Sequence, residues 1–282
     1  MPTPTPSDGV HPGVSFEDYR GWEAVNASSL MVLRDRTPAH LRAQMEAEDK
    51  DTDALRIGRL GHTAILQPGL WTDDHIRGPE GDARTKAYKD AMAELVAENP
   101  DAEIVRAADY DLCLRLRQAV EDHPIARRLL TGMSECSIIW TDPETGLRLK
   151  GRLDMISALA PTIVDLKLVR DASERAMSRA LWDYGYYVQA AHYLDGAFRL
   201  DIDQPRDHFA IVAVEKDPPH AVAIYDLDAA TLAAGLEERD TLLRRYARAA
   251  KTDNWPAYPV KAISLGLPDW AYAAIQGRSQ ER

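Results

Sequence analysis

Two opposite charges, Asp165 and Lys167, interrupt the apolar segment TIVDLKLV. The segment has the composition of a buried strand. Alternate side chains of a strand point to the same face, about 7 Å apart. Burying a carboxylate beside an amine is unfavourable unless both are paired or bound. The segment KGRLDMI places a further carboxylate, Asp154, on an adjoining predicted strand.

Two strand carboxylates with a nearby lysine form a set of hard oxygen ligands. Such ligands suit Mg²⁺ or Mn²⁺, which keep water molecules that can be activated for hydrolysis. For the tripeptide DLK alone, the alternative is an Asp–Lys pair that merely satisfies itself on a sheet face.

Two further sets of side chains have functional spacing on predicted helices. Gln189 and Tyr193 are four residues apart in YYVQAAHYLDGA and therefore share one helix face. His62 lies in RIGRLGHTAIL, where Gly58, four residues earlier, is predicted to leave room for a close approach. The structural alternatives are core residues for the first pair and a buried histidine bonded to a backbone carbonyl for His62.

The elements that must position these side chains follow from periodicity and turn residues. Residues 135–159 are predicted to form a hairpin that turns at 142–146, the next strand is 162–169, and residues 207–227 form a second hairpin. A helical region interrupted near Gly185 precedes that hairpin, and a long amphipathic helix follows it. Amphipathic helices occupy the part before residue 131. This order predicts an α/β chain with a central mixed sheet flanked by helices.

The bulk composition argues against several classes of protein. The 282 residues are 45% hydrophobic and carry a formal net charge of −11, which disfavours a non-specific DNA coat but allows an enzyme with a local basic groove. With only two cysteines, a cysteine-bound cluster is not expected, and a reducing cytoplasm is the predicted compartment. The sequence has no signal peptide, membrane-spanning run or GxxxxGK[ST] loop, so neither membrane nor ATP is expected.

The predicted domain organisation is simple. Residues 1–14, rich in Pro, Thr and Gly, are expected to be a disordered tail. Residues 15–282 are expected to form one domain. Within it, residues 15–130 are a mainly helical portion with His62, and residues 131–282 hold the catalytic core and a C-terminal helix and tail.

Four segments together resemble a known family. They are RIGRLGHTAILQP, SECSIIW…GLRLKGRLDMI, IVDLKLV and YYVQAAHYLDGA. With D-x₁₀-D-x-K, Q-x₃-Y and G-x-x-x-H, they are similar to the phage and prophage exodeoxyribonuclease VIII (RecE-type) domain, in the RecB-like branch of the PD-(D/E)xK nucleases. The resemblance runs from about Trp22 to Tyr225.

The resemblance implies a restriction-endonuclease-like core and an Mg²⁺-dependent exonuclease, with Mn²⁺ as a substitute. Such an enzyme degrades one strand of linear duplex DNA, commonly 5′ to 3′, for recombination by single-strand annealing. It also implies duplex DNA ends as substrate, an annealing protein as partner, often a ring-shaped homo-oligomer, and a phage or prophage origin in a bacterial cytoplasm. Some RecB-like relatives hold an iron–sulfur cluster with four cysteines, which two cysteines cannot do.

The family's roles carry over to this chain residue by residue. The implied metal ligands are His62, Asp154, Asp165 and the backbone carbonyl of Leu166. The implied catalytic residues are Asp154, Asp165 and Lys167, with Gln189 and Tyr193 positioning the scissile strand or Lys167. Glu135 matches an acidic position that assists the metal, and a plain surface glutamate is its alternative.

Several basic side chains near the motifs are candidates for DNA contact, with solvated faces as the alternative. They are Arg56, Arg59, Arg152 and Arg170. Two other functions remain open from the sequence. One is a RecB-like endonuclease or repair nuclease with the same site, and the other is an inactive DNA-end-binding scaffold.

Overall fold

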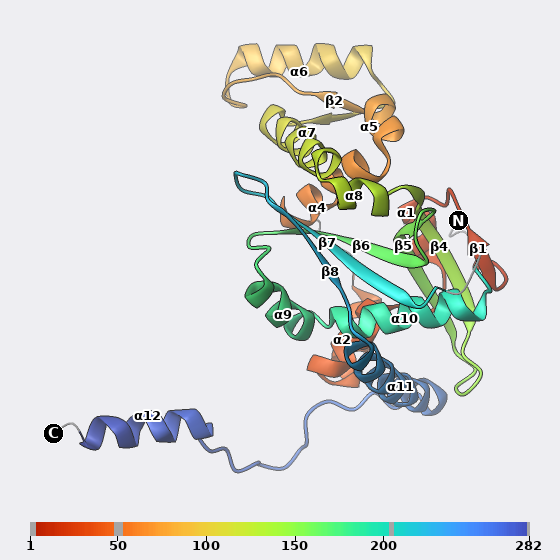
Figure 1. Cartoon of the computed structure of the whole chain (residues 1–282), viewed down its shortest axis with the longest axis vertical. Coiled ribbons are helices and arrows are strands. Elements are labelled where there is room, and N and C mark those ends of the chain that lie inside the picture. Colours follow the sequence, from red (N-terminus) through yellow and green to blue (C-terminus); the bar gives the residue numbers. More distant parts are fainter. Residues whose placement is uncertain (1–3, 48–52, 203–205, 281–282) are drawn as a thin grey trace.

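The structure is a computed structural model that describes residues 4–47, 53–202 and 206–280. Within these residues, the largest sheet has six strands in the order β1-β4-β5-β6-β7-β8 (Figure 1). They are β1 (Gly9–His11), β4 (Gly132–Thr141), β5 (Arg148–Ser157), β6 (Thr162–Val169), β7 (His208–Glu215) and β8 (Val222–Asp226). Strands β6 and β7 are parallel, and the other neighbours are antiparallel. The predicted mixed sheet is confirmed.

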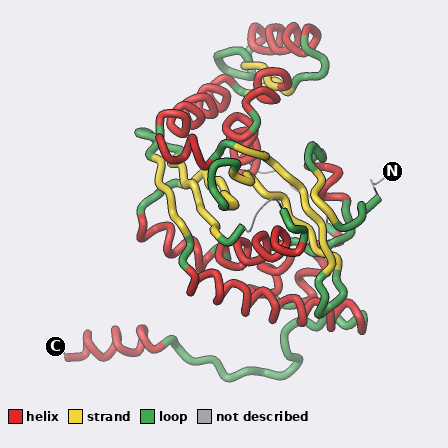
Figure 2. Tube along the Cα trace, turned by 45° about the vertical axis from the view of Figure 1, so that its right-hand side comes forward, coloured by secondary structure: helices red, strands yellow, loops and turns green. Residues whose placement is uncertain are grey.

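Helices cover both faces of the sheet (Figures 1 and 2). The core on one face includes α2 (Ala27–Asp35), α10 (Tyr186–Arg199) and α11 (Ala229–Thr252), and the core on the other includes α4 (Asp53–Leu66), α7 (Ala107–Asp122) and α8 (Pro124–Leu129). Ile163 packs in the first core and the next residue, Val164, in the second. This alternation is that of a strand buried on both faces.

The remaining helices are α1 (Phe16–Gly21), α3 (Pro38–Glu46), α5 (Pro68–Asp74), α6 (Lys86–Glu98), α9 (Glu174–Asp183) and α12 (Asp269–Gln280). Of these, α12 lies apart from the core at the end of an extended C-terminal segment (Figure 1). The predicted interruption near Gly185 is confirmed, because α9 ends and α10 begins on either side of it. No helix in the described part of the chain is long and apolar enough to cross a membrane.

The part before residue 131 is mainly helical, but it also holds a small parallel sheet. Strands β2 (His75–Arg77) and β3 (Glu103–Val105) pair there, between α5, α6 and α7 at the top of Figure 1. Each strand has three residues, which is too short for alternation to be recognised in a sequence.

The N-terminal segment differs from the predicted disordered tail. Residues 9–11 form β1, which pairs with β4 from Gly9↔Ile139 to His11↔Ser137. The Arg148 side chain donates to the backbone carbonyl of Pro6 and lies 3.2 Å from Asp8. Composition alone predicted disorder because it contains no information about β4, which without β1 would leave its backbone N–H and C=O groups unpaired at the edge of the sheet.

Candidate metal centre and active site

The candidate site lies where β5 and β6 separate. These two strands pair only at Met155↔Val164 and Ile156↔Ile163. Beyond that point β5 continues beside β4, and β6 continues beside β7. Asp154 and Asp165 are the first residues past the shared pairing. The backbone N–H of Leu166 donates across the gap to Asp154 Oδ2 at 2.7 Å, so the opening of the sheet is held by a site carboxylate.

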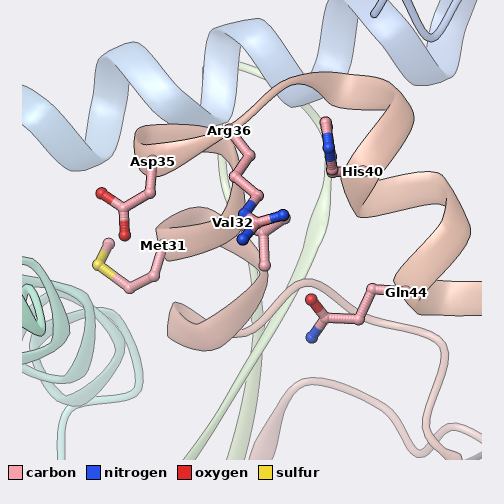
Figure 3. A pocket seen from close by; sticks show the side chains of 6 residues that line it. All are labelled: Met31, Val32, Asp35, Arg36, His40 and Gln44. Atoms are coloured by element: carbon pink, nitrogen blue, oxygen red, sulfur yellow. The ribbon is translucent and has the colours of Figure 1, made fainter.

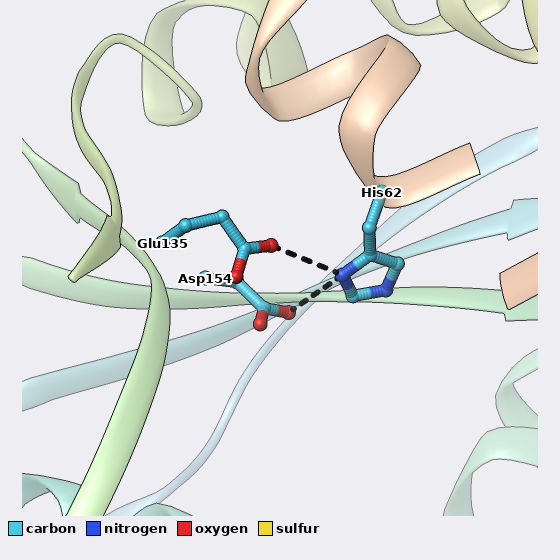
Figure 4. Close-up of side chains that lie close together, drawn as sticks. All are labelled: His62, Glu135 and Asp154. Carbon is cyan, nitrogen blue, oxygen red and sulfur yellow. Dashed lines mark ion pairs between the residues drawn. The ribbon is translucent and has the colours of Figure 1, made fainter. Parts of the chain in front are cut away.

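Three potential metal ligands converge on one side of this opening (Figure 4). His62 comes from α4, Glu135 from β4 and Asp154 from β5. His62 Nδ1 lies 3.7 Å from Glu135 Oε1 and 3.8 Å from Asp154 Oδ2. One ligand atom from each residue lies within 4.8 Å of the other two. Segments that are far apart in the sequence therefore bring an imidazole and two carboxylates together.

Glu135 reaches the cluster through an unusual backbone conformation. Its φ is 49°, in the left-handed region that a non-glycine residue adopts at a cost of about 1–3 kcal/mol. The β4–β5 pairing skips this residue, running from Ser134↔Met155 to Cys136↔Leu153. Arg152 Nε donates to Glu135 Oε2 at 2.7 Å. The structure therefore places Glu135 in the cluster and not on the free surface.

The approach of α4 to the sheet depends on a different glycine from the predicted one. A Cβ on Gly61 would collide with the Leu168 side chain of β6, whereas a Cβ on Gly58 would meet nothing within 4 Å. The close contact is therefore at Gly61, directly before His62. Sequence spacing favoured Gly58 because it lies one helical turn from His62, but the helix packs through its neighbouring face.

A second group of site residues lies between β6 and α10. Lys167 Nζ lies 2.7 Å from Asp165 Oδ2 and donates to Gln189 Oε1 at 3.2 Å. Gln189 Nε2 donates to Asp165 Oδ1 at 3.1 Å and to the Tyr193 hydroxyl at 3.2 Å. The Asp165 side chain is 2% exposed and that of Lys167 is 19% exposed. The carboxylate is thus buried within the network, whereas part of the lysine side chain is accessible.

Tyr193 of α10 is joined to this network through Gln189. It is buried, and its ring packs against Gly151 of β5, where a Cβ would be 3.0 Å from Tyr193 Cε1. Its hydroxyl contacts Gln189 and no other site residue in the described part of the chain. The Tyr193 hydroxyl is therefore placed to orient the Gln189 amide.

The charges of the metal-binding cluster oppose one another. Burial alone would lower the pKa of His62, but the Asp154 and Glu135 carboxylates outweigh it and raise that pKa to about 8. Burial raises the pKa of Asp154 to about 7, with His62 opposing this rise and Asp165 and Glu135 adding to it. Burial disfavours the Glu135 carboxylate, yet His62 and Arg152 hold its pKa below the usual value. Burial is therefore the main effect that opposes ionisation of Asp154, while the neighbouring imidazole and carboxylates act on it in opposite directions.

Lys167 remains charged at neutral pH. Burial lowers its pKa, but Asp165 and then Asp154 raise it above the ordinary value for lysine. An ammonium held this way can stabilise negative charge that develops on a substrate.

The cluster fits a divalent cation. Two carboxylates and one imidazole can hold a divalent cation such as Mn²⁺ or Mg²⁺, and its positive charge would favour the ionised form of Asp154 against the effect of burial and of the neighbouring carboxylates. Of the predicted ligands, His62 and Asp154 belong to this cluster together with Glu135. Asp165 is bonded to Lys167 and Gln189, and its role as a ligand, like that of the Leu166 carbonyl, stays a prediction.

The arginines predicted to contact DNA have different surroundings. Arg56 and Arg59 of α4 pair with Asp109 at 2.7 Å and Glu103 at 2.8 Å, which ties α4 to α7 and β3. Arg152 is 13% exposed and bonded to Glu135. Arg170 is exposed at the end of β6. The structure thus favours a role in positioning site elements for the first three and leaves Arg170 accessible.

Comparisons with known proteins address the fold. A family described as "PDDEXK-like domain of unknown function (DUF3799)" matches residues 27–264. A solved structure from Eubacterium rectale, named a "putative exonuclease", has a TM-score of 0.56 and 15% sequence identity, with 89% of this chain and 93% of that chain covered. A comparison with curated proteins finds no match. At 15% identity, the structural likeness shows a shared fold.

Proposed function

This chain belongs to the family of PDDEXK-like domains of unknown function, and on that premise we propose that it is a divalent-metal-dependent DNA exonuclease. The observation that carries the proposal is the pairing of two groups across the opening between β5 and β6. One is the ligand cluster of His62, Glu135 and Asp154. The other is the Asp165–Lys167 pair held by Gln189. Metal-dependent hydrolysis of a phosphodiester uses a bound cation and a nearby positive charge at the same phosphate, and these two groups can supply them.

Each residue has a role in this proposal. A divalent cation bound at the cluster would activate a water molecule and offset charge on the scissile phosphate. Lys167 presents its ammonium to that phosphate and stabilises the charge that develops in the transition state. Gln189 fixes the amine relative to Asp165, and Tyr193 fixes Gln189. Arg152 holds Glu135 in its aimed conformation.

Finer features of the proposal rest on the family resemblance of the sequence motifs. They are Mg²⁺ as the physiological ion, linear duplex ends as substrate, 5′ to 3′ degradation of one strand, and a role in recombination with a single-strand annealing protein. A ring-shaped homo-oligomer belongs to the same proposal. The description of the Eubacterium rectale protein as a "putative exonuclease" favours exonuclease over endonuclease in this proposal.

The test uses three forms of one plasmid: closed circular, nicked, and linear with one labelled end. With Mg²⁺ or Mn²⁺ the wild-type protein should shorten the linear form from its end and leave the closed circle intact. Cleavage of the closed circle would identify an endonuclease. No cleavage of any form by a protein that binds Mn²⁺ would contradict the proposal and favour the DNA-end-binding scaffold. Asp154→Asn is the matched inactive control, since it removes a ligand charge and almost no volume.

A further inference from the structure

The junction between α9 and α10 is a fixed turn close to the active site. Gly185 has a φ of 67°, and a Cβ at this position would collide with Met31 of α2. Arg34 of α2 donates from Nη1 to the Trp182 carbonyl at 2.7 Å and from Nη2 to the Asp183 carbonyl at 3.0 Å. The turn is therefore held in place by α2, and the residues on it have a defined position relative to the sheet.

Aromatic rings form a continuous path from the catalytic amine to the surface of this turn. Lys167 Nζ lies 4.5 Å from the centroid of the Tyr186 ring. Tyr186 stacks with Tyr184, with ring centroids 5.6 Å apart and ring planes inclined at 30°. Tyr184 is 66% exposed, and so is Trp182, whose ring lies beside the Arg34 guanidinium. We name Tyr184 and Tyr186 the tyrosine step.

The Tyr186 ring packs against the core of the sheet, whereas the Tyr184 ring is exposed and is available to a ligand. The nearby acids do not make this surface strongly negative, because Asp183 pairs with Arg179 and Asp35 with Arg34. Asp35 and Met31 also line a hollow of about 300 Å³ between α2 and α3 (Figure 3). Polar and apolar side chains both line this hollow, and none of the ligand residues is among them. The tyrosine step is the aromatic surface that leads directly to Lys167.

We propose that the tyrosine step is a stacking platform for an unpaired base next to the scissile phosphate, so that the protein engages a single-stranded or frayed DNA end. This inference rests on the proposed nuclease function, because it places a phosphate at Lys167. A base whose phosphate contacts Lys167 lies within reach of rings that begin 4.5 Å from that amine. Inside a duplex both faces of a base are covered by its neighbours, so a base away from a blunt end must be unpaired to stack on Tyr184, and aromatic side chains bind any base in this way.

The experiment measures binding separately from cleavage. Fluorescence anisotropy in chelator gives the Kd of a labelled single-stranded oligonucleotide and of a labelled duplex without single-stranded overhangs. Tyr184→Leu should weaken single-strand binding about tenfold, the usual effect of losing one stacked base. It should change duplex binding less than twofold. Tyr184→Phe, which keeps the ring, should bind like the wild type.

Phe198→Leu is the matched control, because Phe198 is 81% exposed at the other end of α10. It should leave both Kd values unchanged. Thermal unfolding of all variants should match that of the wild type, because the exchanged rings are exposed. An oligonucleotide with one abasic site, moved along the strand, should bind the wild type more weakly at one position and show no such loss with Tyr184→Leu.

Equal single-strand binding by Tyr184→Leu and the wild type would overturn the platform, even if the wild type cleaves DNA. Equal weakening of single-strand and duplex binding would also overturn it, since the step would then not select unpaired bases. Selective weakening in a protein that cleaves no DNA would sustain the platform and refute the proposed nuclease function. The two proposals therefore fail separately.

Discussion

Asp154→Asn should stabilise the protein in chelator while abolishing its response to metal. The Asp154 side chain is 13% exposed. Burial, with the nearby carboxylates of Asp165 and Glu135, raises its pKa from 3.8 to about 7. Above pH 7 that rise corresponds to about 4 kcal/mol of unfavourable free energy for the ionised group. The asparagine amide also needs hydrogen-bond partners in this buried site, which reduces the gain. We therefore expect Asp154→Asn to raise the free energy of unfolding by about 2–4 kcal/mol at pH 8.

The pH dependence of this difference has a definite sign. A carboxyl group whose pKa is higher in the folded protein contributes most below its unfolded pKa, and that contribution is lost as pH rises through the folded pKa. The stability of the wild type relative to Asp154→Asn should therefore fall between about pH 4 and pH 7. His62 faces Asp154, so the titration belongs to the pair.

The assay is urea unfolding in chelator from pH 4 to pH 8, repeated with Mn²⁺. Mn²⁺ at about 100 times its Kd should stabilise the wild type by about 2.7 kcal/mol and leave Asp154→Asn unchanged. Asp165→Asn is the contrasting variant: it removes the partner of Lys167, so it should destabilise the protein by about 1–3 kcal/mol. The reasoning is refuted if Asp154→Asn is less stable than the wild type at pH 8, or if the difference does not change with pH.

Three further sets of substitutions test the geometry of the site. Lys167→Met keeps most of the side-chain length without the charge, so kcat on labelled linear duplex should fall at least about 100-fold while DNA affinity in chelator stays within threefold; a normal kcat would make the Asp165 pair purely structural. Glu135→Gly removes the strain of the positive φ, so by urea unfolding it should be about 1 kcal/mol more stable than Glu135→Ala, although calorimetry should show weakened Mn²⁺ binding for both. Equal stabilities would show that the conformation is unstrained. Gly61→Ala should lower the free energy of unfolding by about 1–3 kcal/mol because of the collision with Leu168, whereas Gly58→Ala should raise it by about 0.5–1 kcal/mol; the reverse order would contradict the observed packing of α4.

The sequence by itself determined the strands β4 to β8 and the pairing of charges within β6, but not the three-residue strands β1, β2 and β3. Period-two alternation in TIVDLKLV placed Asp165 and Lys167 on one face, and the structure brings their charged atoms to 2.7 Å. Helical spacing in the same way placed Gln189 and Tyr193 on one face, where they are hydrogen-bonded. These relations are local, so the geometry of one strand or one helical turn settles them.

Relations between elements were decided only by the tertiary structure. Glu135 has a left-handed backbone and is bonded to Arg152 of the neighbouring strand. Gly61 packs against Leu168, more than 100 residues further along the chain. Which carboxylates gather around His62 depends on where β5 and β6 stop pairing. A strand's period tells which face a side chain points to, but where two strands separate depends on the packing of the whole sheet against the helices on both of its faces.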